Sequence, residues 1–227
     1  MRALVIQTAF PGDVLLTVPL LDALRSLPAT TRLAALVTPE GASILETQRV
    51  ADELIVYDKR SRDVGLAGFA RTVRAVRSYR PDAAVIPHRS FRSALLGLLS
   101  GARRRIGFDA SGGRALLTDI VPYERGAHEI ERVASLARPL GWSGGPGRVP
   151  FRLEVPESGV AEVSELLVSA GVRETERLLA CAPGSRWTTK RWPPERFAAA
   201  LDALEHALEA RAVLVGTADD AGPAAEV

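Results

Sequence analysis

A turn near the amino terminus carries the first residues suited to chemistry. Pro11, Gly12 and Asp13 follow the apolar run at 3–7 and precede an amphipathic segment. A turn that follows the first strand of a parallel sheet lies where open α/β sheets bind ligands. Gly12 allows close approach to the backbone, and Asp13 either caps the next helix or acts as a base. The residues alone favour the cap. The turn matches neither the dinucleotide fingerprint nor a P-loop.

A second polar turn, within residues 182–201, follows another apolar run and precedes a helix that Pro193 or Pro194 begins. Exposed amides and a helix amino terminus can hold an anion there. Hydroxyl, lysine and arginine side chains together suit a diphosphate. Without further information, a solvated basic loop explains the pattern equally well. The candidate residues are Ser185, Arg186, Thr188, Thr189, Lys190 and Arg191.

Basic residues also follow other predicted strands. His88, followed by Arg89, comes after the run at 83–87, and we expect it to face the likely crevice. Two arginine clusters, Arg60 with Arg62 and the arginines at 103–105, suit an anionic ligand, although a solvated surface is the simpler interpretation for each. Of the 29 Lys and Arg residues only two are lysines, Lys59 and Lys190, so each lysine is of interest.

The remaining titratable residues favour structural roles. Asp219 and Asp220 are adjacent rather than spaced as in a D-x-D metal motif, and we interpret them as exposed loop acids. His128 is expected to begin a helix, and His206 to face solvent. Cys181 is expected in the core, and as the only cysteine it forms no internal disulfide. The sequence therefore predicts no metal site and no cofactor.

Composition is that of an ordinary soluble globular chain, with 227 residues, 47% hydrophobic and 25% charged. The formal net charge of +2 argues against a general nucleic-acid binder. No stretch approaches the roughly 20 apolar residues that span a bilayer. We read the first apolar run as a strand rather than a signal peptide, and the cytoplasm is the expected compartment.

Apolar runs alternate with amphipathic segments, which indicates parallel strands joined by helices. The predicted strands are 3–7, 33–37, 54–57, 83–87 and 104–108, then 178–182 and 212–215. The predicted helices are 13–27, 40–48, 64–79, 90–100, 127–141, 157–170 and 194–210.

The glycine-rich stretch 141–148 predicts a loop that approaches a domain boundary. We place the domains at 1–155 and 156–227. The second contains only one β-α-β unit, which is short for a doubly wound domain. We therefore expect a complete first domain and the beginning of a second.

The two turns, taken together with two further stretches, resemble glycosyltransferase family 9, the heptosyltransferases of lipopolysaccharide core assembly. The matching stretches are GDVLLTVP (12–19), PDAAVIPHRSFRSALLGLLSGARRRIGF (81–108), AHEIERVASLARPLG (127–141) and PGSRWTTKRWPPERFA (183–198). The family's later segments, which grip the nucleotide, have no counterpart before Val227. The resemblance therefore suggests a truncated chain.

The resemblance implies an α/β fold of the GT-B type, with an acceptor domain followed by a donor domain. It implies an inverting, metal-independent transfer of heptose from ADP-heptose to an anionic glycolipid acceptor. Asp13 would be the base, and Ser185 and Lys190, with Thr188 and Thr189, would bind the donor diphosphate. Gly12, Arg60, His88 and Arg89 would lie on the acceptor side. Peripheral contact with the inner membrane is expected, and nucleic acid is not a partner.

Two other functions remain open on the sequence. The chain is alternatively a non-catalytic remnant or acceptor-binding module that lacks the donor half, or an unrelated nucleotide-dependent Rossmann enzyme. Neither the sugar, the nucleotide nor the acceptor is fixed by the residues.

Overall fold

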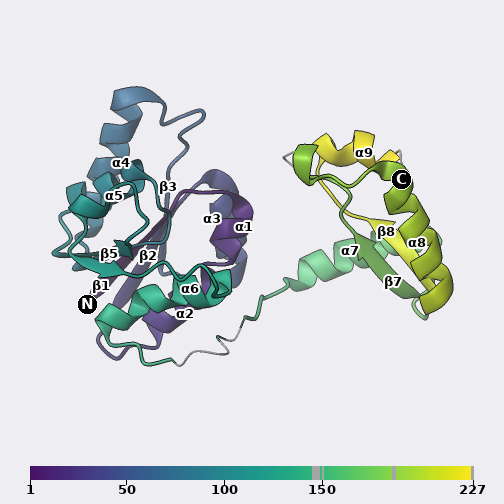
Figure 1. The fold of residues 1–227 in the computed structure, drawn as a ribbon, viewed down its shortest axis with the longest axis horizontal. Helices are drawn as coiled ribbons and strands as arrows, with labels where there is room; N and C mark the ends of the chain where they lie inside the picture. Colours follow the sequence, from purple (N-terminus) through teal and green to yellow (C-terminus); the bar gives the residue numbers. More distant parts are fainter. Residues whose placement is uncertain (145–148, 150, 186–187, 226–227) are drawn as a thin grey trace. The chain divides into compact units, whose positions relative to one another are not determined.

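The computed structural model of the chain describes all residues except 145–148, 150, 186–187 and 226–227. It divides into two compact units, Met1–Val155 and Pro156–Val227. Each unit is an α/β arrangement of helices and strands (Figure 1). The assignment of the first unit to the acceptor and the second to the donor stays a prediction.

Unit 1 contains a six-stranded parallel sheet. Its strands are β1 (Arg2–Gln7), β2 (Arg32–Val37), β3 (Glu53–Val56), β4 (Ala83–Ile86), β5 (Arg104–Phe108) and β6 (Asp119–Val121). Their order in the sheet is β3-β2-β1-β4-β5-β6. β1 therefore lies between β2 and β4, and the chain changes direction across the sheet at this point. Such a switch point is where doubly wound sheets bind ligands.

Helices cover both faces of this sheet, which explains the continuous apolar runs. Along β1, Ala3 and Val5 face one core, whereas Leu4 and Ile6 face the other. The first core is completed by α1 (Pro11–Leu15), α2 (Val18–Arg25), α3 (Pro39–Gln48), α6 (Glu129–Ala134) and the 3-10 helix η2 (Ser135–Leu140). The second is completed by α4 (Gly65–Tyr79) and α5 (Phe91–Leu99).

The prediction of one helix over 13–27 is wrong, because the structure has two helices there, α1 and α2. The cause is Pro19, which has no backbone N–H and whose ring would clash with the carbonyl of Leu15 in a continuous helix. The break leaves the short helix α1, with Asp13 in its first turn, directly after β1.

The segment predicted as a helix over 127–141 is also divided. His128 caps α6, as expected, by accepting a hydrogen bond from the N–H of Ile130 at Nδ1. The chain then tightens into η2, which contains Pro139 and ends at Gly141 with φ of +99°. The sequence did not indicate β6, a strand of three residues, or η1 (Arg114–Leu116). Of the predicted loop 141–148, residues 145–148 lie outside the described part.

Unit 2 begins with α7 (Glu157–Ser169) and contains a parallel pair, β7 (Arg177–Cys181) and β8 (Ala210–Leu214), joined through α8 (Pro194–Leu208). The 3-10 helix η3 (Thr188–Lys190) lies in the loop after β7. The alanine-rich end is helical rather than irregular, with η4 (Ala218–Asp220) and α9 (Ala221–Ala225). Among the described helices of the chain, none has the length and hydrophobicity to cross a bilayer.

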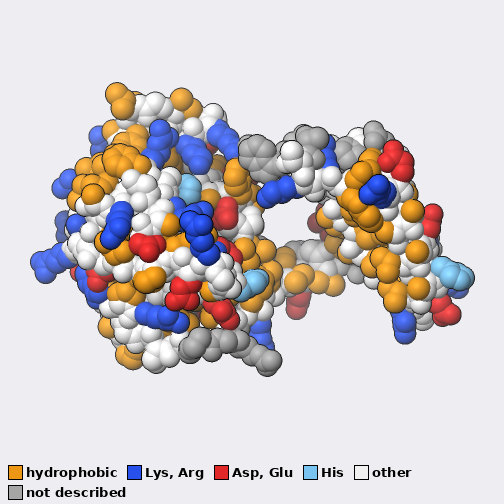
Figure 2. Space-filling model, viewed as in Figure 1, with side chains coloured by type: hydrophobic (Ala, Val, Ile, Leu, Met, Phe, Trp, Pro, Cys, Tyr) orange, Lys and Arg blue, Asp and Glu red, His pale blue; other side chains and the backbone are white. Residues whose placement is uncertain are grey.

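The apolar side chains of unit 2 are largely exposed. Apart from Pro183, Leu201 is the one buried hydrophobic residue that its described part contains. Cys181 is half-buried, so its expected place in a core is wrong. Exposed hydrophobic side chains cover α7 and α8 (Figure 2). They include Val160, Val163, Leu166, Val168, Leu204 and Leu208. Unit 2 thus has far less buried apolar surface to stabilise it than unit 1.

This difference predicts unequal stability. The amide hydrogens of β1 and β4 should exchange with solvent about a thousandfold more slowly than those of β7 and β8, because exchange follows the local free energy of opening. Hydrogen exchange measured by NMR or mass spectrometry on the 227-residue chain tests this. Equal protection of the two sheets would contradict it.

Candidate functional site

The candidate site of unit 1 begins at the ends of the two central strands. Thr8 directly follows β1, and His88 lies two residues after β4. The hydroxyl Oγ1 of Thr8 lies 3.1 Å from Nδ1 of His88. Because β1 and β4 are adjacent, this hydrogen bond spans the switch point of the sheet.

His88 is held by hydroxyl groups. Besides Thr8, Oγ of Ser93 lies 2.9 Å and Oγ of Ser90 lies 3.4 Å from its Nδ1. Burial lowers the pKa of His88, and the charge of Lys59 lowers it further, while the carboxylate of Asp13 acts in the opposite direction. The imidazole is therefore neutral at neutral pH, with Nδ1 committed to the hydroxyls. Nε2 has no hydrogen-bond partner among the described residues.

Lys59 adds the end of a third strand, β3, to the site at Thr8 and His88. It lies three residues after β3, and its Nζ donates a hydrogen bond of 2.7 Å to the carbonyl oxygen of Thr8. Partial burial lowers the pKa of Lys59, and the neighbouring Arg60 and Arg92 lower it further. A desolvated ammonium group with one carbonyl partner retains hydrogen-bonding capacity for an anion, since it has three donors.

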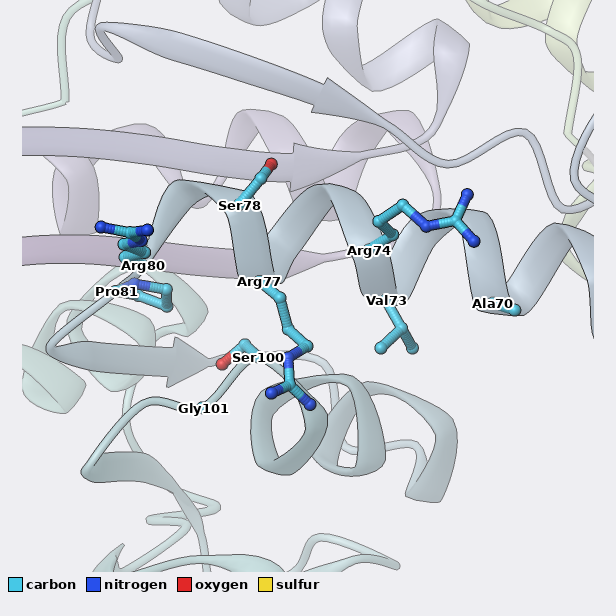
Figure 3. Close-up of a pocket in the computed structure, with 9 residues that line it drawn as sticks. All are labelled: Ala70, Val73, Arg74, Arg77, Ser78, Arg80, Pro81, Ser100 and Gly101. Atoms are coloured by element: carbon cyan, nitrogen blue, oxygen red, sulfur yellow. The ribbon is translucent and has the colours of Figure 1, made fainter.

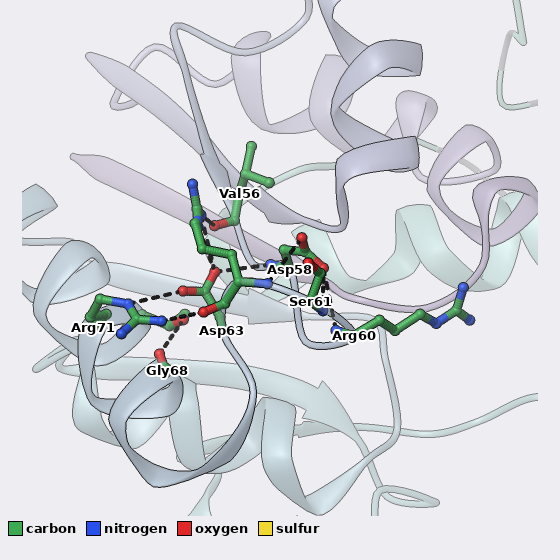
Figure 4. Close-up of polar contacts among 9 residues, drawn as sticks. Val56, Asp58, Arg60, Ser61, Asp63, Gly68 and Arg71 are labelled. Carbon is green, nitrogen blue, oxygen red and sulfur yellow. Dashed lines mark hydrogen bonds and ion pairs between the residues drawn. The ribbon is translucent and has the colours of Figure 1, made fainter.

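The loop that carries Lys59 is fixed by two aspartates (Figure 4). The carboxylate of Asp58 accepts hydrogen bonds from the N–H groups of Arg60, Ser61 and Arg62 at 3.0–3.3 Å. The buried carboxylate of Asp63 accepts from the backbone N–H of Asp58 at 3.1 Å. The loop is therefore closed on itself and presents Lys59 in one position.

Asp63 also joins this loop to α4. It pairs with Arg62 at 3.0 Å and with Arg71 of α4 at 3.2 Å. Burial by itself would raise the pKa of Asp63, but the hydrogen bonds from Arg62, the Asp58 N–H and Arg71 hold it below its usual value. Gly68 makes the contact sterically feasible, because a Cβ there would lie 2.1 Å from the backbone of Asp63.

Asp13 performs the predicted capping contact. Its Oδ2 accepts a hydrogen bond of 3.2 Å from the N–H of Phe10, and its backbone carbonyl accepts one of 2.7 Å from the hydroxyl of Thr17. The side chain of Gln7 donates to Thr17 Oγ1 at 3.1 Å. The other carboxylate oxygen, Oδ1, has no hydrogen bond within the described part of the chain. The cap therefore orients Asp13 without using the oxygen that a base needs.

The other acceptor-side candidates lie around this centre. Gly12 is exposed, and a Cβ there would meet nothing within 4 Å, so the space beside it is open. Arg60 is exposed and forms an ion pair of 3.7 Å with Glu40. The guanidinium of Arg89 stacks 4.4 Å from the centre of the Tyr123 ring. The structure does not test whether they contact an acceptor.

The candidates of unit 2 lie in the loop between β7 and α8. Lys190 and Thr189 are exposed, at the end of η3, and the carbonyl of Ser185 accepts a hydrogen bond of 2.8 Å from Nε of Arg191. Thr188 begins η3, and Arg186 lies outside the described residues. The backbone thus places these residues together after β7, at the carboxyl end of the strand, as the sequence predicts. Their role in binding a diphosphate stays a prediction.

The description of Asp220 as a simple exposed acid is wrong. It is half-buried in η4, and its Oδ2 accepts hydrogen bonds from the N–H and hydroxyl of Thr217 at 2.9 and 2.8 Å. Its carboxylate lies against Gly184, where a Cβ would come within 2.0 Å of Oδ1. Asp220 therefore connects the loops after β7 and β8. Among the described residues, no group of three or more His, Cys, Asp or Glu side chains is arranged to hold a metal ion.

Sequence reasoning missed Thr8, Lys59 and Ser93 as parts of the site. Thr8 gave no usable signal, because its partners His88 and Ser93 lie 80 and 85 residues away in the sequence. Ser93 gave none, because its contact with His88 depends on the fold of one loop. Lys59 did give a signal, since lysine occurs only twice in this chain.

The family model described as "Glycosyltransferase family 9 (heptosyltransferase)" matches residues 69–226, more than half of the chain. His88, Ser185 and Lys190 lie inside this range, whereas Asp13 and Lys59 lie before it. No curated protein matches the sequence significantly.

Solved structures show the same fold. The glycosyl transferase family 9 protein of Veillonella parvula is 24% identical with a TM-score of 0.84, over 99% of this chain and 65% of that one. The ADP-heptose lps heptosyltransferase II of E. coli is 24% identical with a TM-score of 0.75, over 100% and 67%. E. coli heptosyltransferase WaaC, solved with ADP-2-deoxy-2-fluoro heptose, is 20% identical with a TM-score of 0.72, over 99% and 72%. The fold is thus of the GT-B type, and this chain spans about two thirds of these relatives' length.

The geometry around His88 predicts a coupled titration. In the 227-residue chain, His88 should titrate below the usual value of about 6.5. Lys59→Met should raise its pKa, because the variant removes a neighbouring positive charge that disfavours the imidazolium. Lys59→Arg keeps the charge and serves as the control. NMR titration of labelled histidine measures the His88 pKa in the parent chain and in both variants. An unchanged pKa in Lys59→Met would contradict the proximity of Lys59 to His88.

Proposed function

The chain belongs to glycosyltransferase family 9, and from this we propose that it transfers heptose from ADP-heptose to the core region of lipopolysaccharide. The observation that carries the proposal is the family match over residues 69–226, joined to an acid, a neutral histidine and a lysine around the switch point of unit 1. We further propose inversion at the anomeric carbon and no participation of a metal ion.

Asp13 is the proposed base. In an inverting transfer the acceptor hydroxyl attacks the anomeric carbon, the bond to the nucleoside diphosphate breaks, and the hydroxyl proton must be removed. The free Oδ1 of Asp13 supplies the acceptor for that proton. The cap to Phe10 and the hydrogen bond from Thr17 to its carbonyl support this role, because they orient Asp13 before substrate binds.

The acceptor is proposed to be an anionic glycolipid that binds unit 1. Lys59, Arg60 and Arg89 place positive charge around the neutral His88. Phosphate and carboxylate groups of an inner-core sugar would take charge-assisted hydrogen bonds from these side chains. Nε2 of His88 adds a neutral partner for a sugar hydroxyl. Gly12 leaves space for the sugar beside Asp13.

The donor is proposed to bind the loop after β7. Lys190 would neutralise the charge that develops on the departing diphosphate, and Ser185, Thr188 and Thr189 would donate hydrogen bonds to it. The same family assignment makes the cytoplasmic face of the inner membrane the proposed place of the reaction.

Asp13→Asn is expected to lower turnover by about 10²–10⁴-fold, the range that a general base contributes, with little change in ADP binding. ADP release from ADP-heptose with a phosphorylated inner-core acceptor measures turnover, and calorimetry measures ADP binding. Asp22→Asn, the same change in exposed α2 surface, is the control.

Unchanged turnover in Asp13→Asn would remove this residue from its role. If the 227-residue chain binds the acceptor but yields no product, its function is that of an acceptor-binding module instead of a transferase.

Lys190→Ala is expected to weaken ADP binding about tenfold or more, since a hydrogen bond to a charged group contributes roughly 1.5–3 kcal/mol. Arg177→Ala removes a positive charge from the amino end of β7, the other end of the strand, and should leave ADP binding unchanged. Isothermal calorimetry with ADP compares them. Equal affinities of Lys190→Ala and the parent chain would refute the diphosphate assignment.

A further inference from the structure

The outer surface of α4 and α5 has a charge that the rest of the chain does not share. Between Val64 and Phe108 the sequence contains nine arginines and one acid, Asp82. The carboxylate of Asp82 is engaged by the N–H of Arg2 at 2.7 Å. In contrast, unit 2 has 7 Lys and Arg against 12 Asp and Glu. The near-neutral total therefore conceals a basic stretch at 64–108 and an acidic unit 2.

Seven of these nine arginines form no ion pair within the described part of the chain, the exceptions being Arg71 and Arg104. Arg74 and Arg77 lie on the exposed face of α4, and Arg103 follows α5. Arg74 and Arg77, together with Arg80, line an open hollow of about 730 Å³ between the carboxyl-terminal half of α4 and the turn that follows α5. Figure 3 shows Arg77 extending from α4 toward α5 across this hollow. We call the outer surface formed by Leu66, Arg74, Arg77, Leu98 and Arg103 the α4–α5 face.

Apolar side chains are interspersed with these charges. Leu66 at the amino-terminal end of α4 is 89% exposed, and Leu98 on α5 is 38% exposed. Leu66, Ala70, Val73 and Arg77 have helical spacing and form one stripe along α4. Figure 2 shows hydrophobic and basic side chains alternating over the part of unit 1 where α4 lies. A stripe of this composition fits the boundary between lipid headgroups and acyl chains.

We propose that the α4–α5 face docks unit 1 onto a membrane that contains anionic phospholipids. Arg74, Arg77 and Arg103 bind the headgroup phosphates, and Leu66 inserts below them. Arginine suits this position because its apolar stem packs on lipid while its guanidinium remains at the phosphates. A nucleic-acid surface would take the same charge but gives no reason for an almost fully exposed leucine on the same helix as Arg74 and Arg77.

The proposal rests on the proposed function in one respect, since a glycolipid acceptor lies in a membrane. The connection to the candidate site is physical. Asp63 pairs with Arg71 of α4 and also closes the loop that presents Lys59. Because α4 runs from the carboxyl end of β3 back to the amino end of β4, its first turns, with Leu66 and Arg71, are the part of the helix nearest the acceptor-side residues.

Flotation of the 227-residue chain with two kinds of vesicle tests the proposal. The chain should bind vesicles of phosphatidylcholine with phosphatidylglycerol, and not phosphatidylcholine alone, with an affinity that falls as salt rises. Arg74→Glu/Arg77→Glu should lower the partition coefficient roughly 30-fold or more, since each basic residue near an anionic membrane contributes about fivefold. Leu66→Ser should lower it about tenfold.

The controls carry the same changes elsewhere on unit 1. Arg125→Glu/Arg152→Glu alters two exposed arginines near α6 and α3, and Leu153→Ser alters an exposed leucine. Both should bind the anionic vesicles nearly as the parent does. Circular dichroism verifies that every variant is folded.

Three results would overturn the proposal: absence of binding to anionic vesicles, equal loss in the control variants, or binding of a soluble polyphosphate that competes fully and does not depend on Leu66. Calorimetry with ADP separates this from the proposed function. If the chain floats with anionic vesicles but does not bind ADP, the donor assignment is contradicted and membrane docking by the α4–α5 face is supported. If the chain binds ADP but does not float, the docking proposal is contradicted and the donor assignment is supported.

Discussion

Thr8 holds the ends of three strands together, and the candidate site of unit 1 depends on it. Its hydroxyl meets Nδ1 of His88 after β4, and its carbonyl accepts from Nζ of Lys59 after β3. Both groups come from the single residue that follows β1, the strand at the switch point. A charge-assisted hydrogen bond of the Lys59 kind contributes about 1.5–3 kcal/mol. Burial lowers the pKa of His88, and the positive charge of Lys59 lowers it further.

Backbone constraints then place the acid beside this centre. Pro19 prevents a continuous helix after β1. The short helix α1 that results holds Asp13 next to the end of β1. Asp58 and Asp63 do the equivalent for Lys59 by closing its loop, and Arg71 ties that loop to α4. A break at a proline thus positions Asp13, two carboxylates position Lys59, and hydroxyl groups hold His88.

The sequence predicted the strands of unit 1 well, because a sheet covered on both faces requires continuous apolar runs. It also predicted the cap made by His128 and the gathering of Lys190 with its neighbours after β7. It failed where distant residues decide the outcome. The role of Asp220 depends on contact with Gly184, and that of Lys59 on the carbonyl of Thr8, 51 residues away. The division of the first predicted helix was, by contrast, readable from Pro19.

The central claim is that the acceptor binds where β1, β3 and β4 end, at Thr8, Lys59 and His88. The most direct measurement is NMR chemical-shift mapping of the 227-residue chain with a soluble, phosphorylated fragment of the lipopolysaccharide inner core. The account predicts the largest shifts at the Thr8 amide, the Lys59 ammonium group and the His88 ring. Shifts confined to unit 2 or to the α4–α5 face, with these three signals unmoved, would contradict it.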